Sequence, residues 1–361
     1  MTDPRIESYA DLLVERCLDV QPGWQVVVRA TPVARPLVEA VVRRIARRGA
    51  YALQRIAWPV EQSRFGKDWI KEAPEEALDS IPAITLYEAE NEDAAIVIFS
   101  AENTREGSDV DPARRARWTK TAQPLARRHR ALEIPWNACQ YPTPAAAQDA
   151  GMTLAQFEDF VYGACLIDWD ALGETMRRHA EHFSAAEEVR IVGAGTDITL
   201  GIAGREAVVD DGKLNMPGGE FFMSPLEEAT EGVIHYSEFP ASYFTLGRCE
   251  GVRLVFREGR IVEATADTNE EFLLKMLDMD EGARRLGELG IGCNPMIDRH
   301  MENVLFDEKI GGTIHLAVGN AYEFAGGTNK SSLHWDMVKD LRAGGEIHLD
   351  GELVQKDGKW L

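Results

Sequence analysis

The spacing of hydrophobic positions changes about halfway along the 361-residue chain. In the first half, segments with apolar residues three and four positions apart alternate with short strand-like runs, as at residues 24–29, 51–57 and 94–99. The first pattern predicts amphipathic helices, and the short runs predict buried strands. We therefore expect residues 1–183 to form an α/β domain with a largely parallel sheet.

The second half, residues 184–361, is richer in strand patterns. A helix is predicted over residues 268–279, with Thr268 as its cap and Glu271 in the capping-box position. Short strands, several of them separated by glycine-containing turns, are predicted at residues 189–192, 198–202, 233–236, 243–246, 252–256 and 261–265. We expect this half to be a β-rich α+β domain, joined to the first near residues 182–185.

Composition and charge exclude several classes of protein. The chain has 39 Lys and Arg against 60 Asp and Glu, a net charge of −21, and this average field repels a nucleic-acid backbone. The five cysteines are scattered, without the spacing of a disulfide framework or a cysteine zinc site. No apolar core of a signal peptide and no apolar run near 18 residues is present. We expect a cytoplasmic protein that binds neither nucleic acid nor membrane.

Familiar catalytic motifs are missing. The sequence has no GxxxxGK[ST] phosphate loop, no GxSxG elbow and no HExxH helix. What remains is a set of metal-ligand residue types spread over the second half.

Two glutamates of this set stand in unusual local settings. Glu220 follows the Pro-Gly-Gly turn at residues 217–219, where an ordinary hairpin with a solvated carboxylate is the alternative. Glu288 stands in an apolar, glycine-rich segment, and a carboxylate there is costly to bury unless it is paired or metal-bound. Pairing with Arg284 or Arg285 is the alternative for Glu288.

The third segment contains Glu308 and His315. Residues 313–318 read as a buried strand with His315 inside it, and a satisfied core histidine is the commoner explanation of such a position. Tyr322 follows in the expected exit loop of that strand.

The fourth segment contains His334 and Asp336. These two residues share a face only if the backbone is extended, just before a short helix expected at residues 337–342. The alternative is that Asp336 caps that helix.

Together these residues supply four carboxylates and two imidazoles, which suit divalent zinc, cobalt, manganese or magnesium. Six ligands exceed what one tetrahedral ion needs, and they suit two ions that share a bridging carboxylate. One alternative is a mononuclear iron ring-cleaving dioxygenase that uses His315, His334 and Asp336, although it leaves Glu220 and Glu288 without a use. The other is a non-catalytic protein stabilised by metal.

Five segments resemble the M29 family of metallo-aminopeptidases, the aminopeptidase T or thermophilic metalloprotease group. Their order and rough spacing fit over residues 210–345, and Trp136 with residues 141–143 resembles a family segment of the first half. The matching segments of the second half are Asn-Met-Pro-Gly-Gly-Glu at 215–220, Leu-Gly-Glu at 286–288, residues 313–319 with Tyr322, and His-Trp-Asp-Met-Val at 334–338.

The resemblance implies a metal-dependent aminopeptidase that acts on small peptides with water activated by two divalent ions. It further implies an N-terminal α/β domain, a C-terminal catalytic domain, and a homodimer whose active sites face an internal space. Glu308 matches a ligand position less closely than the others, because Gly311 and Gly312 lengthen the stretch before His315 and Asp307 is an adjacent rival. Tyr322 matches a tyrosine that assists catalysis, and we expect Glu288 to bridge the ions. The ligand positions carried over are Glu220, Glu288, Glu308, His315, His334 and Asp336.

Overall fold

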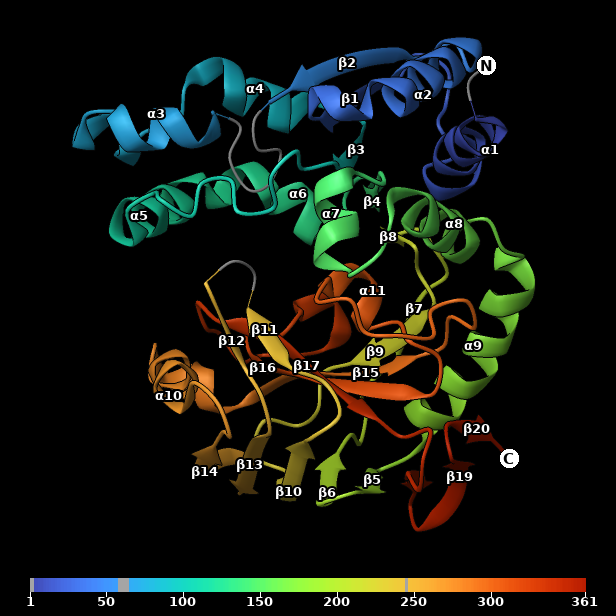
Figure 1. The fold of residues 1–361 in the computed structure, drawn as a ribbon, viewed down its shortest axis with the longest axis vertical. Coiled ribbons are helices and arrows are strands. Elements are labelled where there is room, and N and C mark those ends of the chain that lie inside the picture. Colours follow the sequence, from blue (N-terminus) through green and yellow to red (C-terminus); the bar gives the residue numbers. More distant parts are fainter. Residues whose placement is uncertain (1–2, 58–64, 244–245) are drawn as a thin grey trace. The chain divides into compact units, whose positions relative to one another are not determined.

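The computed structural model describes residues 3–57, 65–243 and 246–361, which divide into two compact units (Figure 1). Unit 1 comprises residues 1–167 and 212–218, and unit 2 comprises residues 168–211 and 219–361. Residue 183, the end of the expected first domain, lies in helix α9 (Trp169–Ala185), which belongs to unit 2.

Unit 1 is built on a five-stranded parallel sheet with the strand order β2-β1-β3-β4-β8. The central strand reads Ala-Ala-Ile-Val-Ile-Phe, the continuous apolar run that a strand covered on both faces requires. The α/β prediction with a parallel sheet is therefore confirmed. The strands are β1 (Gln25–Ala30), β2 (Tyr51–Ile56), β3 (Ala94–Phe99), β4 (Trp136–Gln140) and β8 (Asn215–Met216).

Several helices of unit 1 begin at a side chain that accepts a backbone N–H of the first turn, as at Asp3, Asp111, Thr143 and Thr153. A π-helical stretch, Leu12–Cys17, continues the first helix. The α-helices are α1 (Pro4–Asp11), α2 (Arg35–Arg47), α3 (Gly66–Glu72), α4 (Ala83–Asn91), α5 (Pro112–Ala122), α6 (Arg127–Arg130), α7 (Pro144–Asp149) and α8 (Leu154–Cys165).

Unit 2 contains two larger antiparallel sheets. The eight-stranded sheet has the order β14-β13-β10-β6-β5-β18-β19-β20, and the five-stranded sheet has the order β17-β16-β15-β9-β7. A small sheet pairs β11 (Ala241–Tyr243) with β12 (Gly247–Cys249). The eight-stranded sheet consists of β5 (Glu188–Gly193), β6 (Thr196–Gly201), β10 (Thr230–Tyr236), β13 (Val252–Arg257), β14 (Arg260–Thr265), β18 (Glu346–Leu349), β19 (Glu352–Lys356) and β20 (Lys359–Trp360).

The five-stranded sheet buries one face in the main apolar core of unit 2. That face carries Phe221, Leu289, Ile291, Leu316 and Trp335, which cluster with side chains of the eight-stranded sheet. Because strand residues alternate between faces, the other face is left for different side chains. The strands are β7 (Val208–Asp210), β9 (Glu220–Met223), β15 (Leu286–Gly292), β16 (Thr313–Gly319) and β17 (His334–Asp340), and two short helices complete the unit, α10 (Glu270–Leu277) and α11 (Val304–Asp307).

One expected helix is a strand, and another begins later than expected. Residues 337–340 of the helix expected at residues 337–342 form the second half of strand β17, because every residue from 334 to 340 pairs with β16. The helix expected from Thr268 begins at Glu270, since the Thr268 hydroxyl accepts the N–H of Glu250 and holds that residue in an extended pairing. The expected strand at residues 243–246 includes 244 and 245, which lie outside the described residues.

No helix in the described part of the chain combines the length and the apolar character needed to cross a membrane.

Candidate metal centre

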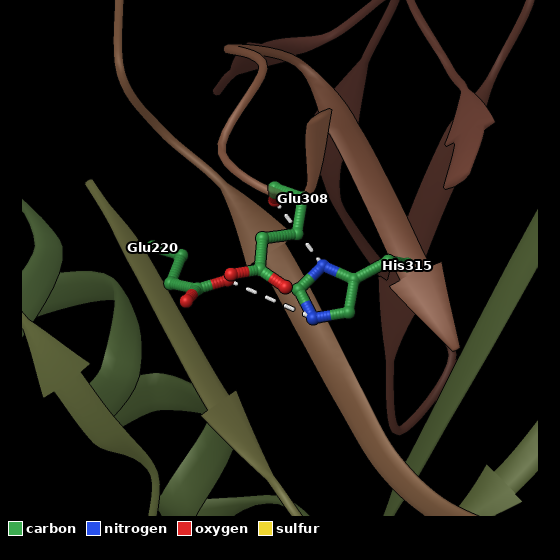
Figure 2. Close-up of side chains that lie close together, drawn as sticks. All are labelled: Glu220, Glu308 and His315. Carbon is green, nitrogen blue, oxygen red and sulfur yellow. Dashed lines mark hydrogen bonds and ion pairs between the residues drawn. The ribbon is translucent and has the colours of Figure 1, made fainter. Parts of the chain in front are cut away.

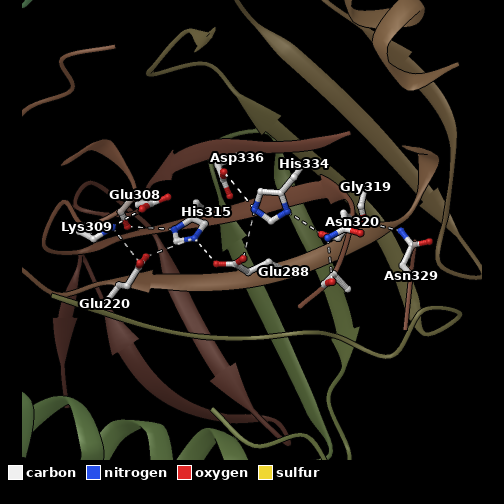
Figure 3. Close-up of polar contacts among 11 residues, drawn as sticks. Glu220, Glu288, Glu308, Lys309, His315, Gly319, Asn320, Asn329, His334 and Asp336 are labelled. Carbon is white, nitrogen blue, oxygen red and sulfur yellow. Dashed lines mark hydrogen bonds and ion pairs between the residues drawn. The ribbon is translucent and has the colours of Figure 1, made fainter. Parts of the chain in front are cut away.

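The six expected ligands lie on one face of the five-stranded sheet of unit 2 or at its edge. Glu220, Glu288, His315, His334 and Asp336 belong to four adjacent strands, β9, β15, β16 and β17, and they alternate with the core residues named above. Glu308 enters from the end of α11. Figure 3 shows these side chains converging along the face. Strand alternation thus separates an apolar face from a ligand-bearing face within the same segments.

The six residues form two groups among the described residues, each with its ligand atoms within 4.8 Å of one another. One group is Glu220, Glu308 and His315, shown in Figure 2. The other is Glu288, His334 and Asp336. Glu288 faces both groups, because its Oε1 lies 3.1 Å from His315 Nε2 and its Oε2 lies 3.6 Å from His334 Nε2.

Each imidazole is oriented by a backbone carbonyl. His334 Nδ1 lies 2.8 Å from the Asn320 carbonyl oxygen, and His315 Nδ1 lies 3.2 Å from that of Glu308. A carbonyl only accepts, so the hydrogen-bond network assigns the Nδ1 proton to both rings. Each Nε2 then faces carboxylates, which is the arrangement of a histidine that ligates through Nε2.

Several carboxylate oxygens of the site are buried without a hydrogen bond. Within the described residues, Glu220 Oε2, Glu288 Oε2 and Asp336 Oδ1 have no hydrogen-bond partner. A buried charge needs a partner, so these oxygens fit a cation that takes carboxylate oxygens and imidazole nitrogens as ligands. The donors fit a divalent ion of the zinc, cobalt, manganese or magnesium type.

The pKa values of the site follow from this crowding of carboxylates. Burial raises the pKa of Glu220 to about 8, against the opposing charge of Lys309. Burial lowers the pKa of His315, but its hydrogen bond to Glu288 and the Glu220 charge outweigh burial and raise it to about 10. Burial also lowers the pKa of His334, but the charges of Asp336 and Glu288 outweigh burial and raise that pKa above its usual value. Without an ion, this face takes up protons to balance its negative charge.

Tyr322 lies in the loop after β16, as expected, and its ring packs against the site. The ring centroid is 5.1 Å from that of His334 and 5.2 Å from that of Phe324. Burial, then the charges of Glu288 and Asp336, raise the pKa of the Tyr322 phenol well above its usual value. The phenol therefore stays protonated and keeps its hydrogen-bond donor.

The structure separates the alternatives for two glutamates. Arg284 pairs with Asp278 and Arg285 donates to the Glu227 carbonyl, so both arginines have partners other than Glu288. The carboxylate of Asp307, the rival of Glu308, accepts the N–H groups of Met301 and Asn303 at 2.6 and 2.7 Å. It is Glu308 that lies in one group with Glu220 and His315.

Sequence reasoning did not single out Lys309. Its side chain is fully buried, with Nζ 3.1 Å from Glu220 Oε1 and paired with Glu308 Oε1. Burial works to lower the pKa of Lys309, but the charges of Glu220, Glu308 and Asp210 raise it above its usual range. A lysine directly after a glutamate is ordinary on a protein surface, so only its burial reveals this position.

One unit of the chain thus carries a buried cluster of carboxylates and imidazoles, the side-chain types that ligate metals, on an antiparallel sheet, and the other unit is a parallel α/β unit. The sequence model of the family described as thermophilic metalloprotease (M29) matches residues 2–360. The chain therefore belongs to the M29 family of metallopeptidases, which are peptide hydrolases, and the resemblance seen in the sequence is confirmed.

Curated relatives span nearly the same length. Aminopeptidase 2 of Geobacillus stearothermophilus is 27% identical, covering 99% of this chain and 95% of its own. Aminopeptidase T of Thermus thermophilus is 28% identical, covering 88% and 85%.

Two solved structures share the fold. Wild-type AmpT from Thermus thermophilus superposes with a TM-score of 0.84 at 23% identity, covering 99% of both chains. A 2,5-dihydroxypyridine dioxygenase from Pseudomonas putida superposes with a TM-score of 0.59 at 15% identity, covering 99% of this chain and 96% of its own. At these identities the likeness concerns the fold.

Proposed function

We propose that the chain is a metal-dependent aminopeptidase that hydrolyses the N-terminal peptide bond of small peptides. The observation that carries the proposal is the convergence of Glu288, His334 and Asp336 beside Tyr322, with buried carboxylate oxygens that have no hydrogen-bond partner among the described residues. The aminopeptidase names of the relatives supply the substrate class.

The proposed metal ligands are the two groups of three residues. Glu288 belongs to the group of His334 and Asp336 and also faces His315 of the other group. Two ions per chain, bridged by Glu288, are the arrangement predicted from the sequence. A bound divalent ion supplies Lewis-acid polarisation of the scissile carbonyl and lowers the pKa of water.

The protein's own groups perform the remaining tasks. The carbonyls of Asn320 and Glu308 hold the imidazoles with Nε2 toward the carboxylates. Tyr322, kept protonated, donates a hydrogen bond to the oxygen that becomes negative as the peptide carbonyl is attacked. Residues 184–361 are the proposed catalytic domain, and a cytoplasmic homodimer is the proposed form.

The test is hydrolysis of leucine p-nitroanilide by chelator-stripped protein, with zinc, cobalt, manganese, magnesium or ferrous iron added back. The matched substrate is acetyl-leucine p-nitroanilide, which lacks the free amine. We expect metal-restored hydrolysis of the first substrate alone. Cleavage of neither substrate, with one tightly held iron and turnover of an aromatic diol, would replace this proposal with the dioxygenase. Tight metal binding without either activity would leave a structural metal protein.

A further inference from the structure

The ammonium group of Lys309 lies inside one of the two ligand groups. Its Nζ is 3.1 Å from Glu220 Oε1 and pairs with Glu308 Oε1, and both carboxylates belong to the group completed by His315. Figure 3 shows the lysine between these two glutamates. The group thus contains a cation supplied by the chain itself.

Lys309 and a metal ion would need the same oxygens. The lysine side chain is fully buried, and a buried ammonium requires carboxylate partners. An ion bound by Glu220 and Glu308 would take these partners away and place its own positive charge beside the ammonium. Like charges at such short range repel strongly where water is excluded. The two cations therefore exclude one another.

The backbone holds Lys309 in this place. Its N–H donates to the Phe306 carbonyl at 3.0 Å, and its carbonyl accepts the Asn294 N–H at 3.0 Å. The next residue, Ile310, forms a bridge with Asn294. Since both neighbours belong to the folded interior, the backbone from which the ammonium reaches the two glutamates is fixed in place.

The other group differs. The side chains facing Glu288 and Asp336 there are imidazoles, and Glu288 Oε2 and Asp336 Oδ1 have no hydrogen bond among the described residues. We propose that Lys309 replaces one of the two ions, so that the chain retains a single divalent ion, held by Glu288, His334 and Asp336. This inference concerns the metal content of the site proposed above and revises the two-ion prediction.

The experiment counts zinc in chelator-stripped protein that is reloaded with excess zinc, desalted and analysed by elemental mass spectrometry. We expect one zinc per chain in the wild type, two in Lys309→Met, which keeps the length of the side chain without its charge, and one in Lys309→Arg. Lys339→Met is the matched control: Lys339 is also fully buried, but it pairs with Glu238, and its loss leaves the count at one.

Glu308→Gln keeps the inference testable if Lys309→Met does not fold. A single ion in the other group leaves the zinc count of Glu308→Gln at one, whereas two ions sharing the site would make it lose one. Two zinc ions per wild-type chain, or a count of one in folded Lys309→Met, would overturn the inference. The count needs no substrate, so it can fail while aminopeptidase activity is present, and it can hold where that activity is absent.

Discussion

The imidazole of His315 lies directly over the α-carbon of Gly290 on the neighbouring strand. The two residues are paired in the sheet register, and a Cβ added at Gly290 would lie 2.0 Å from His315 Cε1 and 2.2 Å from Nε2. Glycine in a strand interior ordinarily weakens the strand. Here it leaves the space in which a ligand-type side chain can lie flat on the sheet.

Gly290→Ala is therefore expected to displace the His315 ring. Overpacking of this kind costs about 1–3 kcal/mol, which thermal unfolding of the purified protein would measure. We also expect weaker zinc binding, because the displaced ring is hydrogen-bonded to Glu288, a proposed zinc ligand. Gly193→Ala is the control, since its new Cβ would make ordinary contacts at 3.5 Å. An unchanged melting temperature and zinc affinity in Gly290→Ala would contradict the packing described.

Glu288→Gln is expected to abolish peptide hydrolysis and metal retention together. The carboxylate faces both histidines, and an amide in its place carries no charge to balance an ion. Far-UV circular dichroism should stay native, because the strand pairing of β15 does not involve this side chain. Glu263→Gln, a change at an exposed glutamate paired with Arg253, serves as the control. Full activity in Glu288→Gln would mean that the site lies elsewhere.

Tyr322→Phe should lower kcat by about 10²–10³-fold, the usual effect of removing one donor to a developing oxyanion. The aromatic packing with His334 and Phe324 survives the change, so KM and zinc content should remain those of the wild type. Steady-state kinetics with leucine p-nitroanilide separates the two constants. Tyr87→Phe, at an exposed tyrosine, is the control. A change confined to KM would assign Tyr322 to substrate binding instead.

The stability of the metal-free protein should fall as pH rises. The pKa of His315 is raised to about 10 in the folded state, from an ordinary 6.5, so its charged form stabilises the metal-free fold. That contribution is complete below about 6.5 and is lost as pH rises through about 10. Thermal unfolding of stripped protein from pH 6.5 to 10 measures it, and His315→Gln should show a flatter profile. A stability that increases with pH over this window would contradict the assignment.

Much of the site was visible in the sequence because strand alternation is a local property. His334 and Asp336 share a face as soon as their segment is extended, and His315 alternates with apolar neighbours that had to be core. The parallel sheet of unit 1 was visible for another local reason, since its central strand β3 is a short continuous apolar run.

Other features depend on contacts between distant segments, which a single sequence does not display. The helix expected after Asp336 is a strand because β16 is available to pair with it. Thr268 does not cap the helix that follows it, because its hydroxyl accepts the N–H of Glu250. Lys309 follows a glutamate as many surface lysines do, and only the packing of its turn against Asn294 puts it in the interior.

The route of the chain between β7 and β9 carries a further consequence. After residue 211 the chain contributes β8 (Asn215–Met216) to the sheet of unit 1 and then starts β9, whose first residue is Glu220 (Figure 1). The unit that holds all six proposed ligand residues is thus discontinuous in sequence. No single cut yields this unit. A fragment that starts at residue 168 keeps the proposed ligands but also carries β8, whose partner strand β4 has been removed. The unpaired edge of β8 would favour association with other chains.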